Sequence, residues 1–484
     1  FVAPALLVAL SFLIYNHPWT RGRAKVLFFA FCAAAFFAIV MTGSRGGALS
    51  FAVGLFVLVW IRSKKVALIT AALLLALLAL IQNPIKERVI NTEPYSYSRV
   101  DIWKSAGRML LDHPQGVGLG NFKFYWTEYN FPVDGAIVRY GKKAATAHGE
   151  YQHFGAEMGF LGIAAILFGL FLLLRACRNS IKVSVSRGDP AAAAGVSAGI
   201  ITVLVHAAVD ANLHEPGIVF LFIMLVVIML QAGEDGRDIR ADLGQSRPMF
   251  AAASLGWVFL MLVWAAVPAI GYYCGTKADA AMKAGNAGEA VKFLDIAQRV
   301  EPGNAEIYNR RAALYFRQSA GDPKAFEKAV TELGKAAKCN PVERSYPAIS
   351  AQIELSAASG KASPDRQLLL SALKDSEYAS RLDPFGWDIM LNRARVLVLL
   401  GDTDNAIKAL ERLKSVEPDC LEGRRLLAVL YKKTGQKDLS AEECRIIIES
   451  FEKYSKGAVM PQERQFLSVD ISAVRALSAE LKKG

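Results

Sequence analysis

The chain has 484 residues, of which 53% are hydrophobic and 21% are charged. The apolar residues are gathered before about residue 270 in runs long enough to cross a hydrocarbon core, which excludes a purely water-soluble protein. The formal net charge is +12, and most of the excess lies in the loops between these runs. It therefore reflects membrane topology, and we do not infer a nucleic-acid partner.

Eight apolar runs make up most of the first half of the chain. They cover approximately residues 1–15, 26–42, 46–61, 66–82, 158–174, 191–209, 216–232 and 249–270. Backbone groups inside a bilayer must find partners within their own segment, so we expect each run to be an α-helix. The first run starts inside an apolar stretch and has no signal-peptide features, so we expect an N-terminally truncated helix bundle.

Basic residues alternate between the loops that join these helices. They follow the first, third, fifth and seventh runs, at Arg21, Arg23, Lys25, Arg62, Lys64, Lys65, Arg175, Arg178, Lys182, Arg187, Arg237, Arg240 and Arg247. Because basic loops stay cytoplasmic, we expect the other side of the membrane to hold the turn at Arg45, the loop 83–157, the turn 210–214 and everything after residue 271.

The chain changes character at about residue 272, where short helical stretches are interrupted at regular intervals. Pro302, Pro341, Pro384 and Pro418 each follow an apolar helix, and the last interval is 34 residues. The earlier intervals are 39 and 43 residues. This spacing resembles a tetratricopeptide α-solenoid, whose helix pairs bury their apolar faces by stacking on each other. We expect about four repeats, and two domains of residues 1–271 and 272–484.

Three polar residues on the expected outer side are candidates for chemistry. Arg45 lies in Gly43-Ser-Arg-Gly-Gly47, Arg99 begins an Arg-x-x-x-Trp segment, and His148 lies where a polar loop enters an apolar helix. Arginine offers a fixed fork of donors to phosphate, and histidine can accept a proton near neutral pH.

Each of these three residues also has a non-catalytic interpretation. Arg45 could be an interface residue whose charge reaches out of the membrane, Arg99 could pair with Asp101 or Glu93, and His148 could simply begin a helix. We favour function for Arg45 because glycines flank it, and for His148 because of its position.

A second polar group lies at the outer end of the sixth run. His206 and Asp210 are four residues apart and share a helix face, and His214 follows them. Ionisable residues in a membrane helix are costly and usually face a protein interior or a wet cavity, so we expect a role in substrate binding. A buried structural His–Asp pair is the alternative.

Two further patterns are weaker. His153 and Glu157 are four apart with Glu150 nearby, but an HExxH motif is absent, so we favour a structural hydrogen bond over a metal site. The glycines in 116–120 have the alternation of a nucleotide loop, but no strand precedes them, so we do not expect a nucleotide site.

The motifs together resemble the O-antigen ligase and O-antigen polymerase family over about residues 26–232. They are the Ser-Arg-Gly turn at Arg45, the Arg-x-x-x-Trp segment at Arg99, a Pro-x-Gly-x-Gly-x-Gly-Asn-Phe turn, and a His-Asn-x-Tyr-like segment at His148 that runs into a Glu-x-Gly-x-x-Gly helix. The chain departs from the family at Gly149, where asparagine is usual. His206 and Asp210 resemble a late His-x-x-x-Asp segment of the same family.

This resemblance implies a polytopic, GT-C-like glycosyltransferase in the bacterial inner membrane, with its repeat domain in the periplasm. The donor is a glycan on undecaprenyl diphosphate, and the acceptor hydroxyl belongs to lipid A core, another glycan or a protein. Arg45 and Arg99 would bind the diphosphate and His148 would be the base. His206, Asp210 and His214 would bind substrate. The outer loops hold no Asp-x-Asp motif, so we expect metal-independent catalysis without a cofactor.

Two alternatives remain open at this point. The enzyme could be an O-antigen or exopolysaccharide polymerase, which shares the donor chemistry of a ligase. The chain could instead be a non-catalytic membrane-anchored scaffold whose repeats recruit a protein partner. A scaffold has no need for the arginine and histidine set, so we favour the enzyme.

Overall fold

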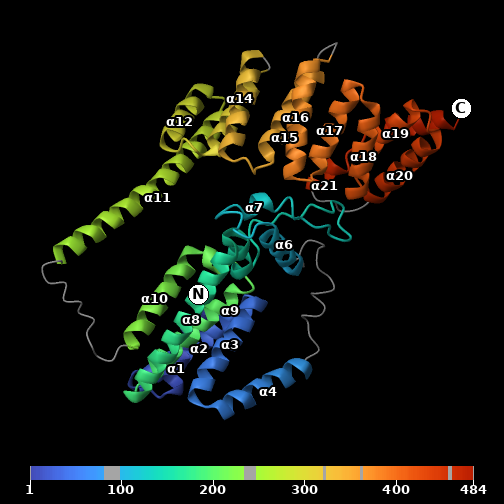
Figure 1. Cartoon of the computed structure of the whole chain (residues 1–484). Coiled ribbons are helices and arrows are strands. Elements are labelled where there is room, and N and C mark those ends of the chain that lie inside the picture. The colour runs from blue at the N-terminus through green and yellow to red at the C-terminus, as the bar shows by residue number, and fades with distance from the viewer. Residues whose placement is uncertain are drawn as a thin grey trace. The chain divides into compact units, whose positions relative to one another are not determined.

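The computed structural model describes residues 2–80, 99–233, 247–319, 323–359, 364–455 and 461–482. Within these ranges the regular structure is helical and contains no strand, which confirms the all-α class (Figure 1). The chain divides into two compact units: unit 1 is Phe1–Tyr129 with Ala144–Asp242, and unit 2 is Asn130–Lys143 with Leu243–Gly484.

The apolar runs lie in helices wherever the structure describes them. The elements of unit 1 are α1 (Val2–Ile14), η1 (Pro18–Thr20), α2 (Arg23–Met41), α3 (Arg45–Arg62), α4 (Lys64–Leu80), α6 (Arg99–Asp112), α7 (Phe122–Tyr125), α8 (Glu150–Ser186), α9 (Ala191–Ala207), η3 (Asn212–His214) and α10 (Pro216–Ala232). In the described part of the chain, five helices are long and apolar enough to cross a membrane: α2, α3, α8, α10 and, in unit 2, α11 (Arg247–Lys283). Helices α1 and α9 are apolar but shorter. The basic residues Arg237 and Arg240 and the loop positions 83–98 fall outside the described residues.

Helix α9 lies in the middle of unit 1 and packs against α1, α3, α8 and α10. Small residues allow this close packing: Gly195 faces Ser11 and Val8 of α1, and a side chain on Gly54 of α3 would come within 3.1 Å of the Ala198 carbonyl. Small residues at helix contacts let backbones approach within a membrane. The end of α9 is thereby held in place by several neighbours.

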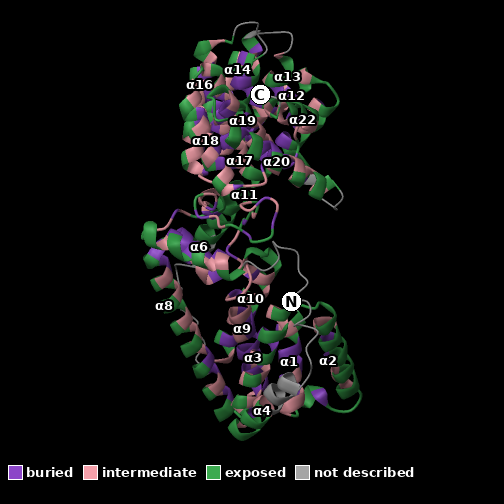
Figure 2. Cartoon of the chain, turned by 90° about the vertical axis from the view of Figure 1, so that its right-hand side faces the viewer, coloured by how far each residue is buried: buried purple, intermediate pink, exposed green. Residues whose placement is uncertain are grey.

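The outer faces of the other helices remain apolar. Phe29 on α2 is 56% exposed, and Leu161 on α8 is 84% exposed. Figure 2 shows exposed residues along most of α2, in contrast to the buried ones on α1 and α3. Large exposed apolar surfaces on long helices fit a lipid environment rather than water, so unit 1 is a multi-pass membrane bundle.

Unit 2 is a stack of antiparallel helix pairs. Its helices after α11 are α12 (Ala287–Val300), α13 (Ala305–Gln318), α14 (Pro323–Cys339), α15 (Ser345–Ser359), α16 (Arg366–Leu382), α17 (Trp387–Leu400), α18 (Thr403–Val416), α19 (Leu421–Lys433), α20 (Lys437–Ser455), α21 (Pro461–Phe466) and α22 (Ile471–Leu481). The pairs are the C-terminal part of α11 with α12, then α13 with α14, α15 with α16, α17 with α18, and α19 with α20. The described residues thus form five pairs, where about four repeats were expected.

The extra pair begins inside α11. Ala278 and Ala281 of α11 pack with Ala290 and Leu294 of α12, while the same helix runs back without interruption to the apolar residues before 270. Pro268 and Gly271 lie just before this repeat, but α11 continues through both, so no helix end marks where the repeat begins. The expected domain boundary at residue 271 falls within α11.

Within the repeats, local signals end one helix and start the next. Gly401 ends α17 in the left-handed region with φ 79°, and the Asp402 side chain then accepts a hydrogen bond from the Asn405 N–H at the start of α18. Both are common helix-terminating and capping devices. Ala394 of α17 and Ala406 and Leu410 of α18 are buried between the paired helices, as small and large residues in alternating positions require.

Buried Glu354 in α15 makes the stability of the repeat domain depend on pH. Its side chain accepts a hydrogen bond of 2.7 Å from the Ser371 hydroxyl, and burial raises its pKa to about 7. The folded state therefore binds a proton more tightly than the unfolded state, so stability falls as pH rises from the ordinary glutamate range through 7. We expect Glu354→Gln to remove this slope and to stabilise the domain at pH 8 by about 3 kcal/mol, judged from the size of the shift. Thermal unfolding of the wild type and the variant at pH 5 and pH 8 measures the difference; equal slopes would contradict the assignment.

Candidate functional site

The candidate site of unit 1 is built around the C-terminal end of α9 and the turn that follows, residues 206–210. Arg99, at the first position of α6, reaches this turn: its Nη1 donates a hydrogen bond of 2.6 Å to the Val209 carbonyl. Its Nη2 lies 3.8 Å from Asp210 Oδ2. Arg99 is therefore in contact with the turn after α9 that carries Asp210.

The turn that carries Arg45 contacts the same place. Ser44 caps α3 by accepting a hydrogen bond of 3.0 Å from the Gly47 N–H, which makes Arg45 the first residue of the helix. At Gly46, an added Cβ would lie 3.1 Å from Val209 Cγ2 and 3.3 Å from His206 Cδ2. The glycine lets the turn approach the end of α9, while the Arg45 side chain is exposed.

The His148 segment also touches the end of α9. His148 has a left-handed backbone with φ 51° and is half-buried, and Gly149 is the N-cap of α8. A Cβ on Gly149 would lie 3.0 Å from the Ala208 carbonyl. Gly149, which stands where the family usually has asparagine, thus brings its backbone close to Ala208.

Asp210 is positioned between two basic side chains. Its Oδ1 accepts a hydrogen bond of 2.9 Å from the Ala211 N–H, which fixes the carboxylate. Its Oδ2 lies 3.8 Å from Arg99 Nη2 and 3.9 Å from His206 Nε2. Among the described residues, the buried Nε2 of His206 has no hydrogen-bond partner. This unpaired atom at the end of α9 is the kind of group that a substrate hydroxyl can satisfy.

His214 lies in a different environment from His206 and Asp210. Its Nδ1 is 3.1 Å from Oε2 of the buried Glu150, and the Leu213 N–H donates a hydrogen bond of 2.6 Å to Glu150 Oε1. The His214 ring also meets the His153 ring edge to face, with centroids 4.8 Å apart. Glu150 therefore fixes the turn after α9 to the first turn of α8.

His153 and Glu157 each accept a hydrogen bond from a backbone N–H group. The Ala147 N–H donates to His153 Nδ1 at 3.3 Å, and the Phe122 N–H donates to Glu157 Oε1 at 3.1 Å. With Nδ1 accepting, a neutral His153 carries its proton on Nε2, which lies 3.5 Å from Glu157 Oε1. These contacts favour the structural interpretation, and in the described part of the chain no three His, Cys, Asp or Glu residues are placed to hold a metal ion.

The glycine-rich turn before α7 packs on a kink in α8. Gly159 interrupts the helix with φ 67°, and a Cβ on Gly116 would collide with the Glu157 carbonyl. The Phe160 N–H donates to the Pro114 carbonyl at 3.0 Å, and the Gly118 N–H donates to the Glu157 carbonyl at 2.9 Å. The glycines thus serve backbone contact between the outer loop and α8.

Two side chains that support the site were not identified as such from the sequence. The sequence pattern marks Glu150 as a possible metal ligand, and the signal for its supporting role is an acidic residue at the first position of a helix. Tyr151 donates a hydrogen bond of 2.9 Å from its hydroxyl to the Leu204 carbonyl of α9. The Tyr of the His-Asn-x-Tyr-like segment was noted only as part of the motif.

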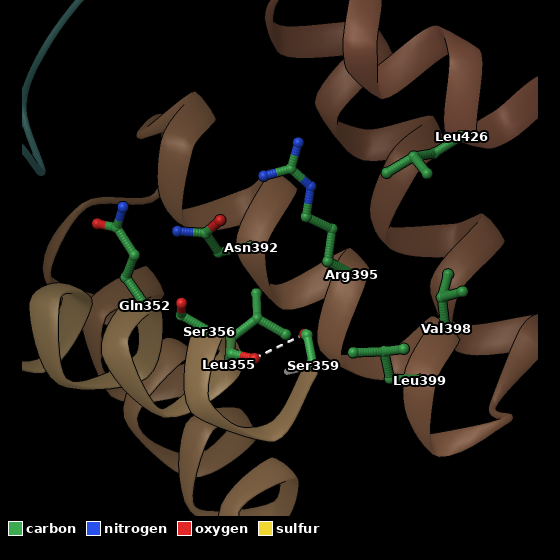
Figure 3. Close-up of a pocket in the computed structure, with 9 residues that line it drawn as sticks. All are labelled: Gln352, Leu355, Ser356, Ser359, Asn392, Arg395, Val398, Leu399 and Leu426. Atoms are coloured by element: carbon green, nitrogen blue, oxygen red, sulfur yellow. Dashed lines mark hydrogen bonds between the residues drawn. The ribbon is translucent and has the colours of Figure 1, made fainter. Parts of the chain in front are cut away.

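Unit 2 carries a pocket of its own on the face formed by α15, α17 and α19. Its volume is about 430 Å³, and its lining residues are Gln352, Leu355, Ser356, Ser359, Asn392, Arg395, Val398, Leu399 and Leu426 (Figure 3). The Arg395 guanidinium lies 3.3 Å from Glu422. The pocket therefore combines apolar side chains with amide and guanidinium donors.

The fold and the site together define a multi-pass membrane protein with a polar cluster at one end of its helix bundle and a helical-repeat domain. Residues 28–167 match the family model described as O-antigen ligase, and residues 276–347 match a tetratricopeptide-repeat model. These matches confirm the family resemblance and the nature of the repeats. The first match includes Arg45, Arg99 and His148, whereas residues 206–214 lie beyond it.

Comparison with whole proteins and solved structures gives the following matches. No curated protein matches the chain. Among solved structures, a MamA protein is 18% identical, with a TM-score of 0.33 over 40% of this chain and 98% of its own. MamA of Desulfovibrio magneticus is 14% identical, with a TM-score of 0.32 over 38% of this chain and 97% of its own. A thermophilic tetratricopeptide protein of Thermus thermophilus is 18% identical, with a TM-score of 0.29 over 44% of this chain and 100% of its own.

Proposed function

We propose that the protein is a glycosyltransferase of the inner membrane that moves a glycan from undecaprenyl diphosphate to an acceptor hydroxyl on the periplasmic side. The observation that carries this proposal is the meeting of three motif segments at the end of α9. Gly46 lies against the side chains of His206 and Val209, Arg99 donates to the Val209 carbonyl, and Gly149 approaches the Ala208 carbonyl. The family match over residues 28–167 supports a ligase or polymerase type of reaction.

The two arginines suit a diphosphate leaving group. Negative charge accumulates on the phosphates as the glycosidic bond breaks, and a guanidinium offers two or more parallel donors without losing its proton. Arg99 uses Nη1 for the Val209 carbonyl and has Nη2 3.8 Å from Asp210 Oδ2. We assign the N–H directions that these contacts leave to the donor diphosphate, with the exposed Arg45 completing the positive field. We propose that this charge replaces a divalent metal ion.

His148 is our proposed general base, which takes the proton of the acceptor hydroxyl as that oxygen attacks the sugar. We assign His206 and Asp210 to orienting the acceptor. Asp210 Oδ2 lies between Arg99 and His206, so the carboxylate would link the donor side to the acceptor side. We keep His214 as a substrate-binding candidate, although its contact with Glu150 favours a supporting role.

Ligase activity toward lipid A core or protein is our first choice, and polymerase activity is the second. Both use the same donor, so the acceptor alone separates them. The pocket of unit 2 favours a protein partner on the repeat domain, because its amide, guanidinium and apolar groups match the backbone and side chains of an extended peptide.

Deleting the gene separates the proposed activities. Loss of long glycan from the lipid core with normal lipid-linked chains indicates a ligase acting on lipid A core. Shortened lipid-linked chains indicate a polymerase, and an unglycosylated protein with intact lipopolysaccharide indicates a protein ligase. Unchanged surface glycans, lipid-linked glycans and glycoproteins would contradict the proposal and favour the scaffold.

Membrane topology provides an independent check of the proposed localisation. We expect labelling from the periplasmic side to reach a cysteine placed at position 120 or 400 and not one at position 182, because the basic loops stay cytoplasmic. A cytoplasmic position 400 would place the repeat domain on the wrong side for periplasmic transfer.

A further inference from the structure

A short segment of the outer loop, residues 130–143, belongs to unit 2 rather than to the membrane bundle. It has internal structure of its own. The Asn130 side chain donates hydrogen bonds of 2.8 Å to the Tyr140 carbonyl and 3.2 Å to the Lys142 carbonyl, and the Val133 N–H donates to the Arg139 carbonyl at 2.8 Å. The segment is therefore a compact loop that presents Val138, Arg139 and Tyr140 together.

Glu417 of the repeat domain accepts the backbone of this loop. Its Oε2 accepts a hydrogen bond from the Arg139 N–H and its Oε1 accepts one from the Tyr140 N–H, each at 2.7 Å. Glu417 is 0% exposed, and burial raises its pKa to about 7 while the two N–H groups oppose this rise. Removing a carboxylate from water is costly unless donors replace the water, and here the outer loop supplies them.

Side chains complete the contact. The Tyr140 ring stacks on Phe385 with centroids 4.2 Å apart and an angle of 5°. Val138 is 9% exposed and joins the hydrophobic cluster that includes Leu413 and Leu421. The contact thus combines one aromatic pair, one buried aliphatic residue and two charge-assisted hydrogen bonds. This combination is typical of a specific docking site.

The acidic residue in the turn after α18 has different partners from the equivalent acidic residues in two other inter-repeat turns. Glu301, Asp383 and Glu417 each precede a proline at the end of a helix pair. Glu301 accepts a hydrogen bond from Asn304 in its own turn, and Asp383 lies 3.1 Å from Arg344 of its own repeat domain. The Glu417 carboxylate instead bonds the two N–H groups of the outer loop.

We propose that two successive inter-repeat turns, one carrying Phe385 after α16 and one carrying Glu417 after α18, form a docking site for residues 130–143 of the same chain, through which the repeat domain positions the outer loop. The segment continues after Lys143 directly into the His148 segment, so its anchoring limits the conformations of the loop that carries the proposed base. This second part of the inference rests on the proposed function, whereas the docking itself does not. Glu417, Phe385 and Tyr140 are positioning residues.

Hydrogen–deuterium exchange of the full-length chain in detergent tests the docking. We expect Glu417→Gln and Phe385→Ala to increase the exchange rate of the amides in 137–141 at least tenfold, because the amide oxygen is a weaker acceptor and the alanine removes the stacking partner. Glu301→Gln is the matched control, since it changes the equivalent turn of another repeat, and it should leave these amides protected. Fast exchange of 137–141 in the wild type, or no change in both variants, would overturn the proposal.

A variant on the loop side covers the case in which a solenoid substitution disturbs folding. Tyr140→Ala leaves the repeats unaltered and should release the loop, whereas Tyr140→Phe retains the ring and should keep it docked. Equal protection in these two variants would overturn the stacking contact. Exchange in α18 and α19 reports the integrity of the repeats in every variant.

Glycan transfer by the same variants tests the positioning role. We expect Glu417→Gln and Tyr140→Ala to lower turnover several-fold and to raise exchange in 144–149, with Tyr140→Phe close to wild type. Released loops with unchanged turnover would overturn positioning while leaving docking intact. A wild-type chain with a docked loop and no transfer activity would instead refute the proposed function alone.

Discussion

Replacing His148 by asparagine is expected to lower glycan transfer by about a hundred- to ten-thousand-fold, the usual contribution of a general base. Asparagine is the sharper choice than alanine because residue 148 has φ 51°, and asparagine tolerates left-handed backbone better than most residues. The variant therefore removes the proton acceptor with little strain. The turnover of purified enzyme with lipid-linked glycan measures the loss, and binding of that donor should persist because the arginines hold it.

His148→Ala and His153→Gln serve as comparisons for this result. His148→Ala should lose as much activity but also some stability, because alanine is strained at this backbone angle. His153→Gln should act through stability, since His153 accepts a hydrogen bond from Ala147 inside the fold. Turnover of His148→Asn within a few-fold of the wild type would remove His148 from the mechanism.

Arg99→Ala should reduce turnover by about a hundred- to a thousand-fold, comparable to removing one preorganised donor from a transition-state site. Arg99→Lys keeps the charge but loses the planar fork, so we expect it to recover only part of the activity. Arg45→Lys should also lower turnover while membrane expression stays normal. Steady-state kinetics with varied donor concentration distinguish a loss in turnover from a loss in donor affinity.

Asp210→Asn separates the two roles that Arg99 can have. The carboxylate lies 3.8 Å from Arg99 Nη2, whereas the Val209 carbonyl holds Nη1 at 2.6 Å. If Arg99 contacts the donor, Asp210→Asn leaves the arginine in place and affects activity less than Arg99→Ala does. Equal losses in the two variants would contradict a donor contact made by Arg99 alone and would indicate that the Arg99–Asp210 pair acts as a unit. Near-normal transfer in both Arg45→Lys and Arg99→Lys would exclude the proposed phosphate contacts.

The helices were predictable because their causes are local. Runs of apolar residues fix the membrane helices, and pairs such as Gly401 and Asp402 fix where a repeat helix ends and the next begins. The kink of α8 was less accessible, because Gly159 lies in an apolar run that a straight helix could also contain. Its partner, Gly116, is far away in the sequence, and only the folded chain shows that the two backbones meet.

The sequence singles out candidate site residues by their type and motif, but it does not show which of them lie in contact. Arg99 and Asp210 were both singled out, yet their proximity depends on α6 reaching the turn after α9. His214 was grouped with Asp210 because it is close in sequence, whereas the short helix η3 places its side chain on Glu150. Contacts through backbone carbonyls, such as those of Ala208 and Val209, have no signature in residue type.

Helix α11 contains both the last apolar span and the first helix of the repeats, so it determines how their faces are rotated about one helix axis. Trp264 is 74% exposed on the apolar part of this helix, and Cys274 is 5% exposed where the repeat begins. Both lie on one helix, which continues through Pro268, so each residue added between them would turn the downstream face by about 100°. The number of residues between Trp264 and Cys274 therefore determines which way the first repeat faces around the helix axis. We expect insertions or deletions here in homologous chains to come in whole helical turns.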